Sequence, residues 1–510
     1  MDKRHFLKLL GVSTMLGVLS GCGDFGDTNV NPVQPTSLNP IFLFSNAQLN
    51  MPFGAQTFQY EAAIVQQAVT PYGGVLAGGN FNQDNRINTQ GNWYQYYDNV
   101  VKPMVDVINT TKSDPNRTNL YNMARILKAW AFQILTDTYG DIPYSQAGLG
   151  YLQSNYFPKY DAQQDIYTDL LKEFEQATAA LDASKPTESG DLFYGGDITK
   201  FKRLGYSLLL RAGMRLTKVN PTLAQQTVQK AVAGGVFQSN ADNAVIYNNG
   251  TYNNPLGSYM NSSEKANYYL TQTFVDYLKR TADPRLSAIA VTYDDPTKNV
   301  GSTGENRDPT KQIGLPIGYS DATLQGAPGY PGSIYKYAQS NRATVVNITA
   351  PLHLITYAQI ALLQAEAAQR GWIQGDPAGL YTAGVTAHMQ QMATYGSASA
   401  IPDASVKTYL AANAYDPARA LELINTQYWV ACYLNFPEAW ANVRRSGYPS
   451  FLVPNNFASQ DVNPRGSLIR RLTYPLNEIS VNSANVSDAI TRTAPGSSID
   501  RLDTRVWWDK

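Results

Sequence analysis

The sequence predicts a mainly α-helical protein whose helices pair into a solenoid-like body interrupted by long irregular loops. Three observations predict this class. Apolar residues recur at helical spacing between residues 120 and 135. Several further helical segments, joined by short turns, follow between 161 and 235. The stretch from about 236 to 350 lacks this pattern and is rich in Asn, Gly, Pro, Ser and Tyr.

The first 40 residues indicate export and a lipid anchor. Lys3, Arg4 and Lys8 precede an apolar run, residues 9–19, that is too short to span a bilayer and is typical of a cleaved signal peptide. The run ends in Leu-Ser-Gly-Cys, which resembles the bacterial lipobox and implies lipidation of Cys22. We therefore predict a signal peptide over residues 1–21. Residues 22–40, rich in Gly, Asp, Asn and Pro, are predicted to form a lipidated flexible tether.

The segment from residue 41 to 147 is predicted to contain helices separated by a glycine-rich loop. Residues 40–72 favour one or two helices, residues 71–90 carry paired glycines, and a helix follows from residue 91 to 109. The next helix buries one apolar face and ends at Gly140, because glycine tolerates positive φ. That face contains Leu120, Met123, Leu127, Ala131 and Ile134. Trp93 and Trp130 are assigned to the core.

Helix-start signals recur after residue 160. Asp161 followed by Gln164 is typical of a capping box, Asp197 can cap a second helix, and Asn220-Pro221 favours the start of a third. Short turns between such helices favour antiparallel pairs stacked as a solenoid, and the pairs resemble tetratricopeptide repeats.

The remainder alternates an insertion with further helices. Residues 236–350 are interpreted as ordered binding loops around one helix at 268–281, because their aromatic content is high. Three further helices are expected, starting at His353, at Asp376-Pro377 and at Asp416-Pro417. Pro437 is expected to interrupt the last of them. The last 65 or so residues are predicted to be irregular.

Composition excludes several classes of function. The chain has 40 basic and 40 acidic residues, so its zero net charge gives no electrostatic case for nucleic acid. The 34 tyrosines suit sugars or peptides, since each offers a flat apolar face and a hydroxyl. Apart from Cys22 the only cysteine is Cys432, which is interpreted as a buried small hydrophobe without a disulfide partner.

Motifs for catalysis or metal binding are missing. The sequence has no Gly-x-Ser-x-Gly elbow, phosphate-binding loop or His-Glu-x-x-His. No metal or cofactor is predicted, although the acidic loops at Asp283 and Asp321 leave a structural Ca²⁺ open. Three carboxylates in apolar surroundings, Glu366, Glu438 and Glu478, leave a glycosidase as a less favoured alternative. An arginine partner, Arg444 or Arg445, is the preferred interpretation of Glu438.

Several motifs in order resemble the SusD/RagB superfamily of Bacteroidetes lipoproteins, in its SusD-like branch. The turn after the first long helix, residues 136–147, reads TDTYGDIPYSQA. The other segments that carry the resemblance are DTNVNP at 27–32, DPRL at 283–286, TYAQIALLQAEAAQRGW at 356–372, EAWANVRRSGYP at 438–449 and RLTYPLNE at 471–478, with Asn482 and Asn485 behind. One departure is Gln359, where the family pattern leads us to expect Glu.

This resemblance implies a single helical domain over residues 41–510, held at the outer face of the outer membrane by its lipid. It further implies a non-catalytic protein that captures oligosaccharides for a partner, a SusC-like TonB-dependent outer-membrane transporter. Peptides are the alternative cargo. The matched motifs belong to the framework of the fold, so the resemblance assigns no ligand-binding residue.

Candidate ligand-binding residues therefore come from the residue types themselves. Exposed aromatics can stack on a ligand, and Asn and Arg can bond its hydroxyl or amide groups. The glycine-rich loop offers Tyr72, Asn80, Asn82 and Arg86, and the insertion offers Tyr252, Asn253, Tyr319 and Tyr330.

Overall fold

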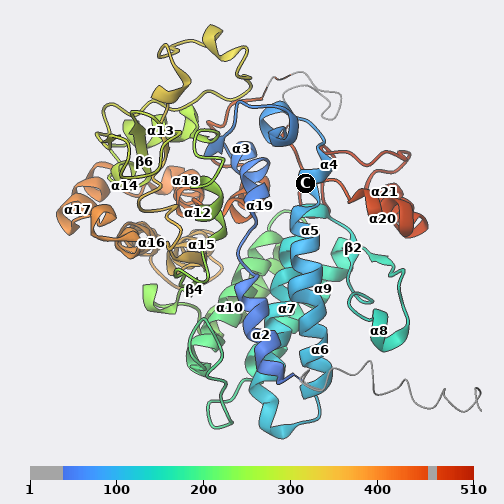
Figure 1. Cartoon of the computed structure of the whole chain (residues 1–510). Helices are drawn as coiled ribbons and strands as arrows, with labels where there is room; N and C mark the ends of the chain where they lie inside the picture. The colour runs from blue at the N-terminus through green and yellow to red at the C-terminus, as the bar shows by residue number, and fades with distance from the viewer. Residues whose placement is uncertain (1–37, 456, 458–467) are drawn as a thin grey trace, which may run out of the picture.

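The structure, a computed structural model, describes residues 38–455, 457 and 468–510. It is mostly helical, as the sequence predicted, and its few short strands form small separate sheets. The predicted signal peptide, Cys22 and nearly all of the predicted tether lie outside the described residues. In Figure 1 one group of helices lies lengthwise in the lower half of the view, and the segment from α12 to α18 lies at the upper left.

The first helical group is a chain of antiparallel neighbours. α2 packs on α6, α6 on α7, α7 on α9, α9 on α10 and α10 on α11. Their bounds are α2 Pro40–Leu49, α6 Lys102–Thr111, α7 Thr118–Tyr139, α9 Gln163–Ala179, α10 Ile198–Arg215 and α11 Pro221–Gly234. A π-helical turn, Tyr97–Val101, joins α5 (Gly91–Tyr96) to α6. The predicted pairing of consecutive helices is thus confirmed for this part of the chain.

The long helix α7 behaves as its pattern predicted. The apolar face from Leu120 to Ile134 is buried, and so is Trp130. Gly140 follows the last turn with φ of 83° and donates its amide to Thr136 O, which ends the helix. Because positive φ strains any residue with a Cβ, glycine suits this position.

Two of the three predicted helix starts are confirmed. Asp197 accepts from the amide of Lys200 at 3.1 Å, and Asn220 accepts from that of Leu223 at 3.1 Å. The prediction for Asp161 is wrong, because α9 starts after Ala162 without a side-chain cap. Asp161 instead lies on β3 and accepts from the amide and hydroxyl of Ser145. It therefore fastens the turn after α7.

The second helical group continues the pairing. α15 packs on α16 and on α18, and α18 packs on α19. The bounds are α15 Tyr357–Gln369, α16 Pro377–Gln391, α17 Asp403–Ala412, α18 Ala420–Ala431 and α19 Phe436–Ser446. Two predicted boundaries are wrong. His353 lies on a strand. Pro437 interrupts no helix but lies in the first turn of α19, where proline fits because no backbone donor is needed.

The insertion contains short strands that tie it to distant segments. β4 (Ala244–Ile246) pairs with β9 (Leu352–Ile355), and β5 (Tyr269–Leu270) pairs with β1 (Ala68–Val69). β6 (Ala290–Tyr293) pairs with β7 (Glu305–Asn306) and β8 (Gln339–Ser340), and β2 (Ile142–Pro143) pairs with β3 (Tyr160–Asp161). The predicted helix at 268–281 starts later, as α13 at Gln272, because β5 takes its first residues.

Shorter helices complete the structure. They are α3 Glu61–Ile64, α4 Arg86–Thr89, α8 Gly150–Gln153, α12 Pro255–Met260, α14 Arg285–Ile289, α20 Leu476–Val481 and α21 Ser483–Thr493. The last two correct the prediction of an irregular C-terminal part, and Figure 1 shows them in red beside β2 and α4. Short 3₁₀ turns lie at Ala55–Phe58, Gly74–Leu76, Gly79–Phe81, Pro115–Arg117, Asn240–Asp242, Leu324–Gly326, Ile334–Lys336, Met392–Tyr395, Ser397–Ser399 and Pro417–Arg419.

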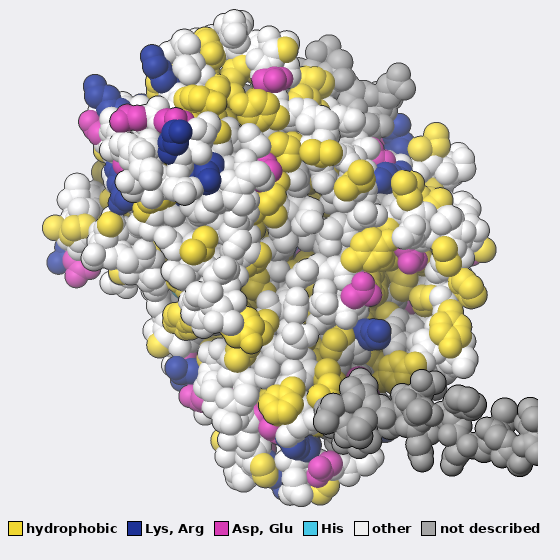
Figure 2. All heavy atoms as spheres, viewed as in Figure 1, with side chains coloured by type: hydrophobic (Ala, Val, Ile, Leu, Met, Phe, Trp, Pro, Cys, Tyr) yellow, Lys and Arg dark blue, Asp and Glu magenta, His cyan; other side chains and the backbone are white. Residues whose placement is uncertain are grey.

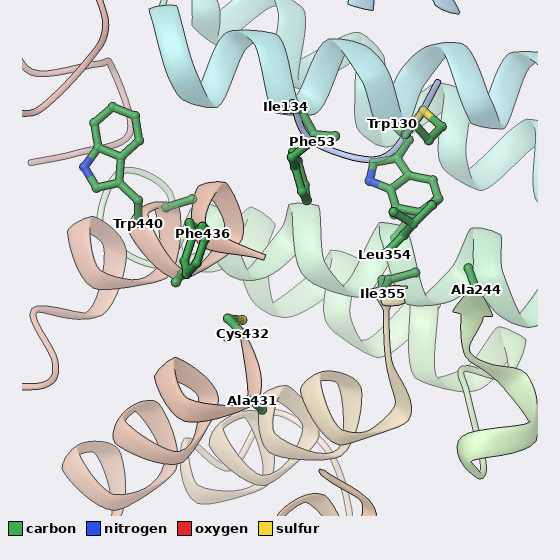
Figure 3. Close-up of a cluster of buried hydrophobic side chains, with 14 of the residues drawn as sticks. Phe53, Trp130, Ile134, Ala244, Leu354, Ile355, Ala431, Cys432, Phe436 and Trp440 are labelled. Carbon is green, nitrogen blue, oxygen red and sulfur yellow. The ribbon is translucent and has the colours of Figure 1, made fainter. Parts of the chain in front are cut away.

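A large hydrophobic core joins the two helical groups. Figure 3 shows members of this core from several elements: Trp130 and Ile134 of α7, Leu354 and Ile355 of β9, and Phe436 and Trp440 of α19. Cys432 is buried, as predicted. Gln359, the departure from the family pattern, is also buried and caps α15 by bonding the amide of Thr356.

Candidate functional site

The two loops that the sequence singled out lie against each other. The first is the glycine-rich loop, residues 71–90, and the second is the segment 316–337 of the insertion. The amide of Asp321 donates to Pro71 O at 2.9 Å. Figure 1 shows the second loop in yellow at the top of the molecule. Segments almost 250 positions apart in the sequence thus form one surface.

Asn80 fastens these loops together. Its side-chain amide donates to Thr70 O at 2.9 Å and to Tyr319 O at 3.0 Å, and its carbonyl accepts from the amide of Gly318 at 2.7 Å. The side chain is buried, with 1% of its surface exposed. Asn80 therefore positions the predicted binding loop and offers no surface to a ligand in this conformation.

Six tyrosines gather on this surface, which we call the tyrosine face. Its members are Tyr72, Tyr269, Tyr319, Tyr330, Tyr335 and Tyr337. Tyr337 is buried and lies 6.4 Å, between ring centroids, from both Tyr269 and Tyr330. Tyr335 is 37% exposed, and Tyr72, Tyr319 and Tyr330 are half-buried. Buried rings thus form a base that carries more exposed rings above it.

Four hydroxyl groups of this face are available to a ligand. Within the described residues, those of Tyr72, Tyr319, Tyr330 and Tyr335 form no hydrogen bond. Burial, followed by the proximity of Tyr335 and Asp321, raises the pKa of Tyr72, so its phenol stays protonated near neutral pH. A protonated phenol can donate and accept, and its ring can stack on an apolar face of a sugar or peptide.

The second loop carries one exposed charge of each sign, Asp321 and Lys336. Figure 2 shows hydrophobic side chains along the upper part of the view, while Lys, Arg, Asp and Glu gather mainly at its upper left. Such a face suits a neutral ligand better than a strongly charged one.

Two other predicted residues of the glycine-rich loop bond to other parts of the protein and stabilise the fold. Asn82 is buried with φ of 49° and donates to Asn455 O at 2.9 Å. Arg86 donates to Asp84 at 2.7 Å, to Asp500 at 3.0 Å and to Tyr474 O at 2.8 Å. Both side chains are engaged by the protein, and neither joins the tyrosine face.

Tyr252 and Asn253 lie on a separate loop that directly precedes α12 in the sequence. Both are exposed, and the amide of Tyr252 donates to the side chain of Asn249. Within the described residues, no hydrogen bond or ring contact connects Tyr252 or Asn253 to the tyrosine face. The predicted set of ligand residues is therefore divided between two places.

Sequence reasoning missed Tyr269, Tyr335 and Tyr337. The density of tyrosine between residues 319 and 337 was the available signal for two of them. Tyr269 could not be found in this way, because only the pairing of β5 with β1 brings it to the first loop.

The buried carboxylates are held as structural ion pairs. Although burial raises the pKa of Glu366, Arg445 and Arg370 outweigh this effect and hold it at about 2. Glu438 accepts from Arg215 and Tyr428, so the prediction of an Arg444 or Arg445 partner is wrong. Arg445 pairs with Glu366 instead. A general acid needs a raised pKa, which these two carboxyls do not have.

Burial raises the pKa of Glu478, the third carboxylate, which accepts from the hydroxyl of Tyr160 at 2.9 Å. Asp283, one of the two acidic positions considered for Ca²⁺, is buried and pairs with Arg285. Over residues 38–455, 457 and 468–510, no group of three His, Cys, Asp or Glu side chains is arranged to hold a metal ion. The helices of these same residues include none long and apolar enough to cross a membrane.

Comparison with known proteins gives consistent matches over nearly the whole chain. The model of a SusD-like family, described as "Starch-binding associating with outer membrane", matches residues 32–475. A search of curated proteins found no match.

Solved structures of similar fold cover the chain almost completely. A protein titled as chitin-binding is 31% identical, with a TM-score of 0.80 over 92% of this chain and all of the other. A SusD-like protein titled "Bacteroidetes AC2a" is 26% identical, with a TM-score of 0.79 over 93% of this chain and all of the other. A chitin-binding SusD homologue from Flavobacterium johnsoniae is 24% identical, with a TM-score of 0.77 over 92% of this chain and 98% of the other. At this identity the match supports the fold and nothing more.

The helical fold, the matched framework motifs and the family match over residues 32–475 agree: the chain belongs to the SusD-like family of outer-membrane-associated, glycan-binding proteins.

Proposed function

We propose that this protein captures oligosaccharides at the cell surface without cleaving them. It delivers them to a SusC-like TonB-dependent transporter in the outer membrane. Lipid on Cys22 anchors it there, and residues 23–40 act as the tether. The observation that carries the proposal is the tyrosine face, which places several aromatic rings with unbonded hydroxyls on two loops locked together by Asn80.

The physical reason is the chemistry of sugars. A pyranose ring has apolar C–H faces that stack on aromatic rings, and equatorial hydroxyls that exchange hydrogen bonds with phenols. The tyrosine face supplies both kinds of contact. Chitin oligomers are the first cargo to test, because the 31% identical structure is titled as a chitin-binding protein. Starch oligomers come next, because of the description of the family.

Calorimetric titration of residues 23–510 tests the proposal. The ligands are N-acetylglucosamine oligomers, maltooligosaccharides and a mixture of short peptides. We expect saturable binding of one oligosaccharide class. Replacing Tyr72 or Tyr335 by Ala removes one stacking platform and is expected to weaken binding about three- to tenfold. Tyr156→Ala is the matched control, because that ring is 68% exposed on a different loop.

Other results would identify the alternatives. Binding of peptides alone would replace oligosaccharides by peptides as cargo. Release of shorter sugars during incubation would contradict a non-catalytic role and favour a glycosidase. If Tyr252→Ala weakens binding while Tyr72→Ala and Tyr335→Ala do not, the site belongs to the loop in front of α12.

A further inference from the structure

A surface groove beside the tyrosine face is divided into two lobes by Arg280, the last residue of α13. The first lobe has a volume of about 510 Å³ and is bounded by α13, Ile317 and residues 451–454. The second has a volume of about 410 Å³ and lies between α13, α17 and α18. Arg280, Tyr277 and Phe451 line both lobes, so the two form one groove with a central ridge.

The ridge is an aromatic stack that holds a guanidinium group. The rings of Tyr277 and Phe451 stack at 5.2 Å between centroids with an angle of 15° between their planes. The Cζ atom of Arg280 lies 5.9 Å from the first ring and 5.5 Å from the second. Within the described residues its N–H groups form no hydrogen bond or ion pair, so the guanidinium is oriented by the rings while its donors stay available.

The second lobe contains a hydroxyl that lacks a partner. Thr426 is 4% exposed, and its Oγ1 forms no hydrogen bond in the described part of the chain. A buried hydroxyl without a partner is unfavourable, so such groups in native proteins call for a ligand or water that completes them. Thr426 lines the lobe together with Asn413, Tyr409 and Glu422. The Oγ1 atom has almost no exposed surface, so a ligand hydroxyl in this lobe would reach it only after a small shift of the lobe wall.

The charges of the groove favour a neutral ligand. Arg280 and Asp276 lie on the wall of the first lobe, and Arg419 and Glu422 lie on that of the second. Arg419 is itself paired with Glu422 at 3.1 Å. The first lobe thus carries one charge of each sign. In the second lobe, which Arg280 also lines, the charge of Arg419 is balanced by Glu422. Both lobes offer donors and acceptors to hydroxyl and amide groups.

The first lobe runs up to the tyrosine face. Pro316 and Ile317 line it, and the next two residues, Gly318 and Tyr319, are those that Asn80 holds. Ile317 also packs against the hydrophobic cluster beneath the tyrosines. Residues 316–319 therefore connect the wall of the first lobe with the tyrosine face.

We propose that this groove is a second part of the binding site, which holds the distal units of a long, neutral oligosaccharide. This inference rests on the proposed function, since it extends a ligand bound at the tyrosine face. Sugar rings occupy the lobes on either side of Arg280, whose guanidinium donates to their hydroxyl or N-acetyl oxygens. Thr426 marks the inner end of the site. Long oligomers consequently bind more tightly than short ones.

Calorimetric titration with N-acetylglucosamine disaccharide and hexasaccharide, and with the maltose series, tests the extended site in the chain 23–510. Arg280→Ala and Thr426→Val are expected to weaken hexasaccharide binding, Arg280→Ala by about tenfold, and to leave the disaccharide at the tyrosine face unchanged. Arg280→Lys keeps the charge but loses the planar donors, so it is expected to resemble Arg280→Ala. Arg307→Ala is the control, because Arg307 pairs with Glu305 and lines neither lobe.

Thermal melting first checks that the variants are folded. The outcomes then show whether the extended site, the proposed function or both are overturned. If Tyr335→Ala weakens binding while Arg280→Ala and Thr426→Val do not, the extended site is overturned and the proposed function stands. If the groove variants weaken disaccharide and hexasaccharide equally, the groove is the primary site and not an extension. If neither oligosaccharide series binds the unmodified chain, both proposals are overturned.

Discussion

Glu61, on α3, is a buried carboxyl without an arginine bonded to it. It is 1% exposed and accepts from Asn92 Nδ2 at 3.1 Å. Burial raises its pKa to about 7, although a backbone hydrogen bond, Arg444 and Asn92 act in the opposite direction. The native protein therefore holds a proton on Glu61 that the unfolded chain has lost above its ordinary pKa of 4.5.

The pH dependence of stability follows from this proton. Between pH 4.5 and 7 the native state binds more protons at Glu61, so its contribution to the free energy of unfolding falls as pH rises, by up to about 3 kcal/mol. Glu61→Gln is expected to remove this fall and to stabilise the protein at pH 8. Urea unfolding of the unmodified protein and of Glu61→Gln at pH 5 and 8 measures the two changes in the free energy of unfolding. Equal losses of stability in the two proteins between these pH values would contradict the assignment.

Pairs of buried charges join the helices of the second group. Arg445 of α19 donates to both oxygens of Glu366 on α15, at 2.8 and 2.7 Å, and also to Asn425 of α18 at 2.8 Å. Glu366 and Arg445 are both fully buried. Three helices are thus fixed in one relative arrangement, because a bidentate pair constrains both distance and angle.

Removing one charge of this pair is expected to destabilise the fold strongly. Glu366→Gln leaves Arg445 buried without its counter-charge and is expected to lower the free energy of unfolding by about 3–5 kcal/mol. Glu175→Gln is the control, because that carboxylate pairs with Lys230 at the surface, where such a pair contributes about 0–1 kcal/mol. Urea unfolding at pH 7 compares them. A change no larger than that of the control would show that the helices do not depend on this pair.

At the scale of the whole molecule, the proposed anchor determines where the protein acts. Cys22→Ser removes the thiol that would be acylated, so the chain is expected to leave the outer-membrane fraction. Membrane fractionation and immunoblotting detect this, and calorimetry on the purified variant checks that ligand affinity is unchanged. Retention of the variant in the membrane would show that another contact, such as the transporter, holds it there.

The sequence alone predicted the fold class and the individual helices well. The apolar face of α7, the caps Asp197 and Asn220 and the burial of Cys432 depend on neighbours a few residues apart, and local patterns record them. The motifs from 136 to 478 also identified the family, which the match over residues 32–475 confirmed.

Only the tertiary structure decided which side chains meet. Asp161 follows the pattern of a helix cap, yet it bonds Ser145, because the pairing of β2 with β3 brings that turn to it. Glu438 pairs with Arg215 of α10 rather than with the nearby Arg444. Likewise, Asn80 was predicted to touch ligand, and it instead fastens the loop that carries Tyr319.

The candidate site shows the same division. The residue types alone predicted its chemistry, namely tyrosine-rich loops in an exported chain. The sequence named Tyr72, Tyr319 and Tyr330 but not the remaining members. Tyr269 and Tyr335 come from other segments, which the pairing of β1 with β5 and the bonds of Asn80 bring to Tyr72. Sequence determined the elements and their apolar faces, since these follow from local spacing. The contacts between distant loops depend on side chains far apart in the chain, and the folded structure alone sets their distances.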